Sequence, residues 1–241
     1  MSLNFLTTPA FSYPYENYGV LGNIINTLYL VVITLIIATP VGVGAAIYLT
    51  EYAKQGRLTR IIEFTTETLA GIPSIIYGLF GMIFFVVFLK WDYSLMAGAA
   101  TAAIMVLPTI LSTTKEALDA VPDSYREGSF ALGTGKLRTI FKVVLPAAVP
   151  GILSGIILAI GRIVGETAAL LYTSGTATRG LSKGLMSSGR TLAVHMYTIS
   201  SEGFHTKQTF ATAVILLVFV FIINTLSSVA AKQISKKAGG Q

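Results

Sequence analysis

Five long runs without a charged residue constrain this chain more than any other feature of its sequence. A membrane-spanning helix needs about 20 mainly apolar residues at 1.5 Å per residue, so each run is long enough to span a bilayer. The sequence therefore predicts an all-α membrane protein with five transmembrane helices. The runs are Asn17–Thr50, Thr68–Leu89, Tyr93–Thr114, Val143–Gly161 (extending to Thr178 with two interruptions) and Gln208–Ala231.

The composition favours a membrane protein over a soluble one. Of the 241 residues, 53% are hydrophobic and 12% are charged, whereas a soluble domain carries about 25% charged residues. Five buried helices in a soluble protein would need a polar shell that this chain lacks. Cysteine is absent, which excludes disulfides and thiolate metal sites. We expect the lipid bilayer as a partner and no nucleic acid.

The Lys and Arg residues predict the orientation of the chain. Segments 51–67, 115–142 and 232–241 hold eleven of them, the alternate segments hold five, and Arg162 lies inside a run. Cytoplasmic segments carry the excess of Lys and Arg, so the N-terminus is expected outside and the C-terminus inside. The predicted organisation is an extracytoplasmic segment 1–19, a transmembrane domain 20–235 with a cytosolic loop 115–146 and an outer loop 173–207, and a cytosolic tail 236–241.

Helix breakers interrupt several of the runs. The first contains Pro40, the third contains Pro108, and the second opens with Gly71-Ile72-Pro73-Ser74 and continues with Gly78 and Gly81. Small residues let helices pack closely, while irregular backbone inside a membrane is tolerated where it is buried in protein or lines a cavity. Both interpretations remain open, and Gly71, Pro73 and Ser74 are candidates for a transport pathway.

The cytosolic loop predicts a short helix that is well defined at both ends. Pro122 ends the extension of the third span, since the residue before a proline disfavours helix. Asp123 can cap a new helix from Ser124 to about Leu132, and Gly133 can end it in the left-handed conformation. Tyr125, Phe130 and Leu132 would give this helix an apolar side suited to docking in a groove of a partner.

A second short helix is expected from about Lys136 to Leu145, with Pro146 opening the fourth span in its first turn. Gly133-Thr134-Gly135-Lys136 looks briefly like a phosphate-binding loop of an ATPase. That motif needs Gly where Phe130 stands and Ser or Thr where Leu137 stands. The motif fails, so we expect neither catalysis nor a catalytic residue, and no cofactor or metal, in this chain.

The loop resembles the cytosolic coupling loop of ABC-importer permeases, which reads Glu-Ala-Ala, three residues, Gly, nine residues, Ile, one residue, Leu-Pro. Glu127, Gly133, Val143 and Leu145-Pro146 fit this spacing without a gap, with Gly128 and Ser129 in place of the alanines. The resemblance implies that the loop docks on a separate ATPase that binds ATP and Mg. The residues implied in this coupling are Asp123, Tyr125, Arg126, Glu127, Phe130, Ala131, Leu132, Gly133, Leu145 and Pro146.

Further stretches resemble phosphate permeases. They are Leu69–Gly81, Val121–Ser124 and Gly161–Ala168, and the last, followed by Ala169–Thr173, is similar to the A-type subunit of phosphate importers. The resemblance implies the MetI-like permease fold in a bacterial inner membrane. It also implies a heterodimer with a C-type phosphate permease, two ATPase subunits and an external phosphate-binding protein. A sixth helix usually precedes this core, and because none of the 19 residues ahead of it can span, we expect that an N-terminal helix is missing from this sequence or is supplied otherwise.

Arg162 and Glu166 are the candidate pathway residues with ionisable side chains. They stand four residues apart, which would place them on one helix face, and ionisable residues within spans usually face a cavity or each other. Arg offers a planar fork that matches phosphate oxygens. We hypothesise that Arg162 meets the anion while Glu166 holds or releases it, and a structural Arg162–Glu166 pair is the alternative.

The outer loop holds Arg179, Lys183, Arg190, Lys207, His195 and His205 against a single Glu202. Residues 191–201 predict a short interfacial helix, and the basic side chains are alternatively a rim for the binding protein. The competing functions are a related permease for sulfate or molybdate and a stand-alone secondary transporter. The latter leaves the loop from Glu127 to Pro146 unexplained.

Overall fold

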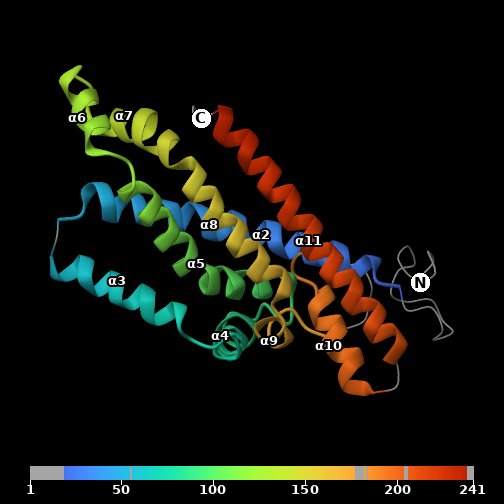
Figure 1. Ribbon diagram of the computed structural model, residues 1–241. Coiled ribbons are helices and arrows are strands. Elements are labelled where there is room, and N and C mark those ends of the chain that lie inside the picture. Colours follow the sequence, from blue (N-terminus) through green and yellow to red (C-terminus); the bar gives the residue numbers. More distant parts are fainter. Residues whose placement is uncertain (1–18, 55, 177–181, 183, 204–205, 238–241) are drawn as a thin grey trace. The chain divides into compact units, whose positions relative to one another are not determined.

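The computed structural model describes residues 19–54, 56–176, 182, 184–203 and 206–237, and all regular structure in these ranges is helical. This confirms the all-α prediction (Figure 1). The first 19 residues, on which an extracytoplasmic segment was predicted, lie almost entirely outside the described residues. The helices are α2 (Leu21–Ile47), α3 (Arg57–Ala70), α4 (Ser74–Gly81), α5 (Leu95–Asp119), α6 (Asp123–Ala131), α7 (Lys136–Thr139), α8 (Leu145–Gly165), α9 (Ala168–Leu171), α10 (Leu192–Glu202) and α11 (Thr206–Lys237), with π-helical segments η1 (Tyr48–Tyr52), η2 (Met82–Phe88) and η3 (Ile140–Val144).

Among the described residues, four continuous helical stretches are long and apolar enough to cross a membrane. They are Leu21–Tyr52, Leu95–Asp119, Lys136–Gly165 and Thr206–Lys236. A fifth span is present if the bent pair formed by α3 and by α4 with η2 counts as one. The prediction of five spans is confirmed in that sense.

The second span, predicted over Thr68–Leu89 with helix breakers at Gly71-Ile72-Pro73-Ser74, is broken at these residues. The α3 helix ends at Ala70, and the Gly71 N–H donates to the carbonyls of Glu67 (3.3 Å) and Thr68 (3.2 Å). Pro73, in an extended conformation with ψ 140°, then opens α4. The break falls here because the residue before a proline disfavours helix and proline itself cannot continue the hydrogen-bond ladder.

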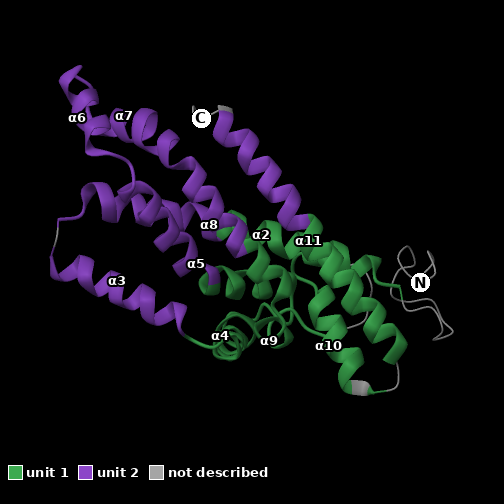
Figure 2. Cartoon of the chain, in the orientation of Figure 1, with its two compact units in different colours: residues 1–37, 72–105, 160–222 green, residues 38–71, 106–159, 223–241 purple. Residues whose placement is uncertain are grey.

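The chain forms two compact units, and the four long helices α2, α5, α8 and α11 each run through both (Figure 2). Unit 1 comprises residues 1–37, 72–105 and 160–222, and unit 2 comprises residues 38–71, 106–159 and 223–241. Unit 2 has an apolar core drawn from α2, η1, α5, η3 and α8. Its buried residues are Ala46, Leu49, Leu111, Leu118, Val121, Val144, Ala148 and Ile152.

Glycines let α4 pack tightly inside unit 1. A Cβ atom added at Gly78 would lie 2.8 Å from Ala169 Cα, and one added at Gly81 would lie 2.8 Å from Thr173 Cγ2. Real Cβ atoms essentially never approach that closely, so α4 packs on the α9 backbone at Gly78 and on the Thr101 and Thr173 side chains at Gly81 without room for a larger residue. Close packing, rather than a cavity, therefore accounts for Gly78 and Gly81.

The helix predicted over 191–201 exists as α10, and its first five positions, 191–195, are buried while Tyr197 is exposed. Thr191 caps it by accepting a hydrogen bond from the Val194 N–H (3.3 Å). Leu192 packs in a core cluster with Val20 and Ile215. The burial of this first half follows from its apolar side chains, which gain free energy when they are removed from water.

The prediction of Arg190 as an exposed rim residue is wrong. Its side chain is buried, Nε and Nη2 donate to the Thr176 carbonyl, and Nη1 donates to Nδ1 of His195 at 3.3 Å. Burial and the neighbouring Arg190 charge lower the pKa of His195 to about 4, so this imidazole is neutral. Lys207 is exposed on α11, whereas Arg179, Lys183 and His205 lie outside the described residues.

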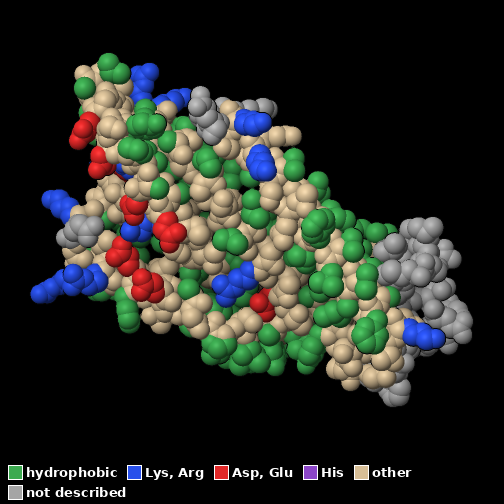
Figure 3. All heavy atoms as spheres, in the orientation of Figure 1, with side chains coloured by type: hydrophobic (Ala, Val, Ile, Leu, Met, Phe, Trp, Pro, Cys, Tyr) green, Lys and Arg blue, Asp and Glu red, His purple; other side chains and the backbone are tan. Residues whose placement is uncertain are grey.

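The outer surface is largely apolar where the chain is expected to face lipid. Along α11, Phe210, Leu217 and Phe221 are all highly exposed. Acidic and basic side chains instead gather over the part of unit 2 that holds α3 and α6 (Figure 3). A band of exposed apolar residues beside a charged end is the pattern expected of a membrane-embedded protein.

Candidate coupling and pathway sites

The predicted coupling helix is α6, whose predicted N-terminal cap is wrong and whose predicted C-terminal stop is confirmed. The helix begins at Asp123 with Pro122 as its N-cap, and no side chain caps it. Asp123 was predicted as the cap, but its carboxylate instead accepts a hydrogen bond from Arg126 Nη1 (3.2 Å). Gly133, at φ +76°, is the predicted left-handed stop, and its N–H donates to the Phe130 carbonyl (2.9 Å).

The second predicted short helix does not end before the fourth span. From Lys136 the chain runs through α7 and η3 into α8 as one helical stretch to Gly165. The predicted start of the fourth span at Leu145-Pro146 matches the start of α8 at Leu145, but no break separates α8 from the preceding turns, and both residues are half-buried within the continuous helix. Proline lacks the N–H of a regular turn, and the π-helical segment η3 lies directly before it, where a local adjustment can absorb the missing bond.

Arg126 anchors α6 to the rest of unit 2. Its Nε and Nη2 donate to Oε1 of Glu51 in η1 (3.1 and 2.9 Å), Nη1 donates to the Val121 carbonyl (2.8 Å), and Nη2 donates to the Leu118 carbonyl (3.0 Å). The Arg126 and Glu51 side chains are 16% and 8% exposed. The guanidinium is thus directed into the chain, so its role here is to fix α6 in place.

A cluster of three hydroxyl groups closes the other end of α6 against α7. Ser129 Oγ lies 2.8 Å from Thr139 Oγ1 and 2.5 Å from Thr134 Oγ1, and the two threonine oxygens are 3.1 Å apart. Ser129 and Thr139 are buried. Ser129, which takes the place of an alanine in the resembling motif, therefore has a defined structural role.

With its polar anchors directed inward, α6 leaves apolar side chains on the surface. Tyr125 is 52% exposed, Phe130 is 45% exposed, and Leu132 is 85% exposed. Glu127 and Ala131 are exposed as well. An exposed leucine at the end of a rigidly held helix is the feature expected of a docking element.

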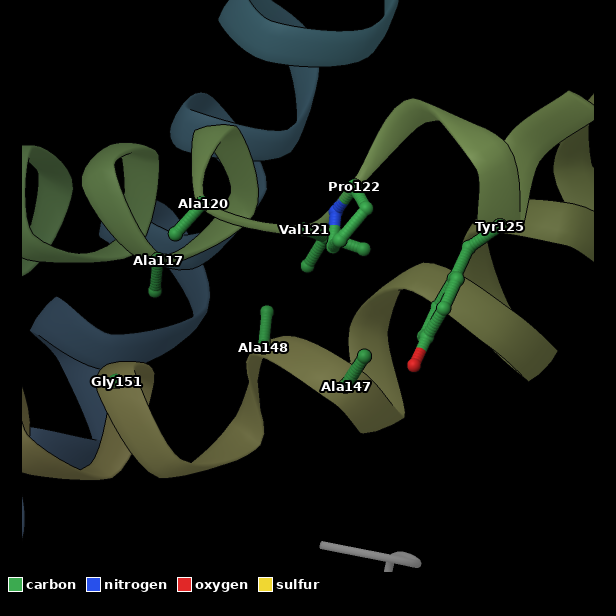
Figure 4. Close-up of a pocket in the computed structure, with 8 residues that line it drawn as sticks. All are labelled: Ala117, Ala120, Val121, Pro122, Tyr125, Ala147, Ala148 and Gly151. Atoms are coloured by element: carbon green, nitrogen blue, oxygen red, sulfur yellow. The ribbon is translucent and has the colours of Figure 1, made fainter.

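A hollow of about 300 Å³ lies beside α6, between the end of α5 and the start of α8 (Figure 4). Its lining residues are small apart from Tyr125, which stands at its edge. Close packing of α5 and α8 borders it, because a Cβ added at Gly151 would lie 2.5 Å from Ala117 Cβ. At Gly155 an added Cβ would lie 2.8 Å from Thr113 Cβ. The other lining residues are Ala120, Val121, Pro122, Ala147 and Ala148.

The structure does not form the Arg162–Glu166 ion pair that was the alternative to a pathway role for these residues. The α8 helix ends at Gly165, so Glu166 leaves the helix face on which Arg162 stands. The Glu166 side chain is buried and its Oε1 accepts a hydrogen bond from the Ala169 N–H (3.0 Å), which caps α9. Glu166 therefore accepts a hydrogen bond from an unpaired N–H group in the first turn of α9 instead of pairing with Arg162.

Arg162 is half-buried near the end of α8. Within the described residues of the chain, no hydrogen bond or ion pair engages its guanidinium. Ser74, the first residue of α4, is half-buried in the same unit, while Gly71 and Pro73 are exposed at the break that precedes it. No hydrogen bond between described residues joins Ser74 to Arg162 or to Glu166.

Sequence reasoning missed Glu51 and the Gly151/Gly155 contact. Glu51 is the first charged residue after the long apolar run of α2, a position where an ionisable side chain signals a specific partner. Gly151 and Gly155 form the small-xxx-small spacing that marks close helix contacts in membranes. Both signals were present in the sequence, but their partners, Arg126 and the α5 helix, could be identified only from the fold.

Comparison with known proteins identifies the fold and its relatives. Residues 38–239 match the family described as binding-protein-dependent transport system inner membrane component. The chain is 34% identical over 215 residues to a probable ABC transporter permease protein, YqgI, of Bacillus subtilis, covering 84% of this chain and 73% of that protein. It is 41% identical over 157 residues to the phosphate transport system permease protein PstA 1 of Mycobacterium tuberculosis, covering 65% of this chain and 51% of that one.

Among solved structures, the inward-facing MetNI methionine ABC transporter matches with a TM-score of 0.75. The match covers 93% of this chain and 99% of that chain at 18% sequence identity. At this identity the likeness concerns the fold alone, and it confirms the predicted MetI-like permease fold.

Proposed function

Because the chain belongs to the family of inner membrane components of binding-protein-dependent transport systems, we propose that it is the permease subunit of an ATP-driven importer of inorganic phosphate. As a membrane component it is a non-catalytic subunit. Its proposed task is to form the translocation pathway and to receive work from a separate ATPase.

The observation that carries this proposal is the construction of α6. Glu51, Ser129 and Gly133 fix the helix at both ends from inside unit 2, while Leu132 and Phe130 remain exposed. A helix that is rigidly held and apolar at its tip can transmit a displacement of its docking partner without bending first. The proposed partner is a dimer of ATPase subunits, which would bind ATP and Mg.

Phosphate is the proposed cargo because relatives named as phosphate permeases are similar over much of the chain. The structure adds Arg162, a half-buried guanidinium without an ion-pair partner among the described residues. Arg matches phosphate oxygens with two parallel N–H donors. In the proposed pathway Arg162 contacts the anion, while Glu166 fixes α9, against which α4 packs through Gly78.

The proposed assembly contains a C-type phosphate permease as the heterodimer partner and an extracytoplasmic phosphate-binding protein. Isolation of the tagged chain from membranes tests this composition. We expect an ATPase subunit and a second permease in the purified complex, whereas a chain that purifies alone from gently solubilised membranes contradicts the proposed assembly.

Substrate-stimulated ATP hydrolysis by the reconstituted complex tests the cargo. We expect inorganic phosphate to stimulate hydrolysis and sulfate and molybdate to leave it at its basal rate. Stimulation by sulfate or molybdate instead would assign the permease to another oxyanion. Phosphate flux that depends on an ion gradient and not on ATP would assign it to secondary transport.

A further inference from the structure

The π-helical segment η1 at the end of α2 contacts the coupling loop at two neighbouring residues. Glu51 Oε1 accepts two hydrogen bonds from Arg126 of α6. The next residue, Tyr52, contacts Lys136, the first residue of α7, whose Nζ lies over the ring 4.8 Å from its centre. One turn at the end of a spanning helix therefore holds both short helices of the coupling loop.

Of the two η1 residues in these contacts, Glu51 is the charged one and is more deeply buried than Tyr52. Its side chain is 8% exposed, and the Arg126 guanidinium that it holds also donates to the Leu118 and Val121 carbonyls at the end of α5. Arg126 thereby joins three elements, α5, α6 and η1. The rigid fork of a guanidinium keeps these elements at fixed separations.

The position of the contact is informative as well. Stability alone could be served by apolar packing, since replacing a buried ion pair with hydrophobic residues is often neutral or stabilising. A buried ion pair instead fixes one arrangement of its partners. The η1 segment is the last turn of the spanning helix α2, which ends at the extended residue Ala53, and it lies where this helix meets the loop.

We infer that Glu51 is a positioning residue for energy coupling: through Arg126 it links a displacement of α6 to the first spanning helix. This inference rests on the proposed function of α6 as the docking element. It predicts that loss of the Glu51 carboxylate separates ATP hydrolysis from transport, because α6 could then move without moving α2.

The test uses membrane vesicles from cells that express the chain together with its partner subunits. Phosphate taken up per ATP hydrolysed is measured for the wild type and for Glu51→Gln, with chain abundance and basal ATP hydrolysis as separate readouts. We expect the ratio to fall by about tenfold at normal abundance and normal basal hydrolysis. A wild-type ratio overturns the inference.

Two further variants separate positioning from general damage. In an Arg126→Gln background, Glu51→Gln is expected to lower the ratio no further, since both changes break the same link. If the two substitutions together lower the ratio by the product of their separate effects, the link does not run through Arg126. The control is Glu63→Gln, which removes the carboxylate that lies 3.4 Å from Lys115 at the surface of the same unit and is expected to leave the ratio unchanged.

If Glu51→Gln does not accumulate in the membrane, Glu51→Asp takes its place. It keeps the charge but shortens the reach to Arg126, so a lowered ratio at normal abundance is expected and a wild-type ratio overturns the inference. Charge reversal at both positions is unsuitable, because a carboxylate at position 126 would face the Leu118 and Val121 carbonyls. Vesicles in which even the wild-type chain takes up no phosphate would instead contradict the proposed function.

Discussion

In the coupling loop the guanidinium of Arg126 is held by hydrogen bonds to Glu51, Asp123 and two carbonyls, whereas the guanidinium of Arg162 engages no such partner among the described residues. The loop also differs in its apolar residues, since it exposes Leu132 while α4 and α9 bury their contact around Gly78. A guanidinium whose donors are all engaged within the chain, such as that of Arg126, fixes the structure around it. A guanidinium inside a span without such partners, such as that of Arg162, is suited to binding an anion.

The largest effect is expected at Arg162. Arg162→Gln should lower phosphate uptake by about a hundredfold, as loss of one preorganised donor to an anion does in other sites, with normal chain abundance in the membrane. Arg162→Lys should retain part of the uptake because it keeps the charge but not the planar fork. Uptake assays with immunoblotting of the membranes check this.

Arg60→Gln, at an exposed position of α3, serves as the control for Arg162 and should leave uptake near the wild-type rate. Normal uptake by Arg162→Gln at normal abundance would remove Arg162 from the pathway and erase the contrast between the two arginines.

A smaller effect is expected from overpacking α4. Gly81→Ala places a Cβ 2.8 Å from both Thr101 Cγ2 and Thr173 Cγ2 and should destabilise the folded chain by about 1–3 kcal/mol. Gly44→Ala is the matched control, since nothing lies within 4 Å of its added Cβ. Thermal unfolding of the detergent-solubilised protein measures both, and equal stability of the two variants would contradict the tight packing of α4 against Thr101 and Thr173.

The docking surface should be sensitive to a polar change that spares the fold. Leu132→Ser removes the most exposed apolar side chain of the coupling loop and is expected to weaken retention of the ATPase subunit by about tenfold. Leu58→Ser on α3, where the leucine is also highly exposed, is the control. Titration of the purified permease with the ATPase compares them, and equal affinity would exclude Leu132 from the interface.

The smallest effect concerns the helix propensity of α6. Gly128→Ala meets no atom within 4 Å and should stabilise the helix by about 0.5–1 kcal/mol. Transport should be unchanged, because the exposed residues and the Arg126 anchor are untouched. A loss of transport at normal abundance would show that the α6 surface at position 128 must be free of a side chain.

Most of the structure that could be predicted from the sequence was predicted from the long apolar runs and from the turn residues of the coupling loop. Five spans and the left-handed stop at Gly133 follow from local rules on apolar length and on glycine conformation. The sequence could not show that Glu166 leaves the helix face of Arg162, because that depends on the end of α8 at Gly165 and on the N–H groups of α9. Spacing by four residues predicts a pair only while the helix continues.

The buried positions were harder to predict than the spans. Arg190 belongs to a basic outer segment by composition, yet the fold buries it against the Thr176 carbonyl and His195. Arg126 was expected to face the ATPase, and the fold directs it toward Glu51, which lies 75 positions away in the sequence. Both outcomes are set by tertiary contacts that a one-dimensional pattern does not contain.

Phosphate uptake by proteoliposomes, measured with and without the ATPase subunits and ATP, shows whether a separate ATPase drives this chain through α6. We predict that phosphate enters only when the ATPase is bound and ATP is present on the side of the membrane that carries α6. Uptake by the purified chain alone, or uptake driven by ATP added only on the opposite side, would contradict it.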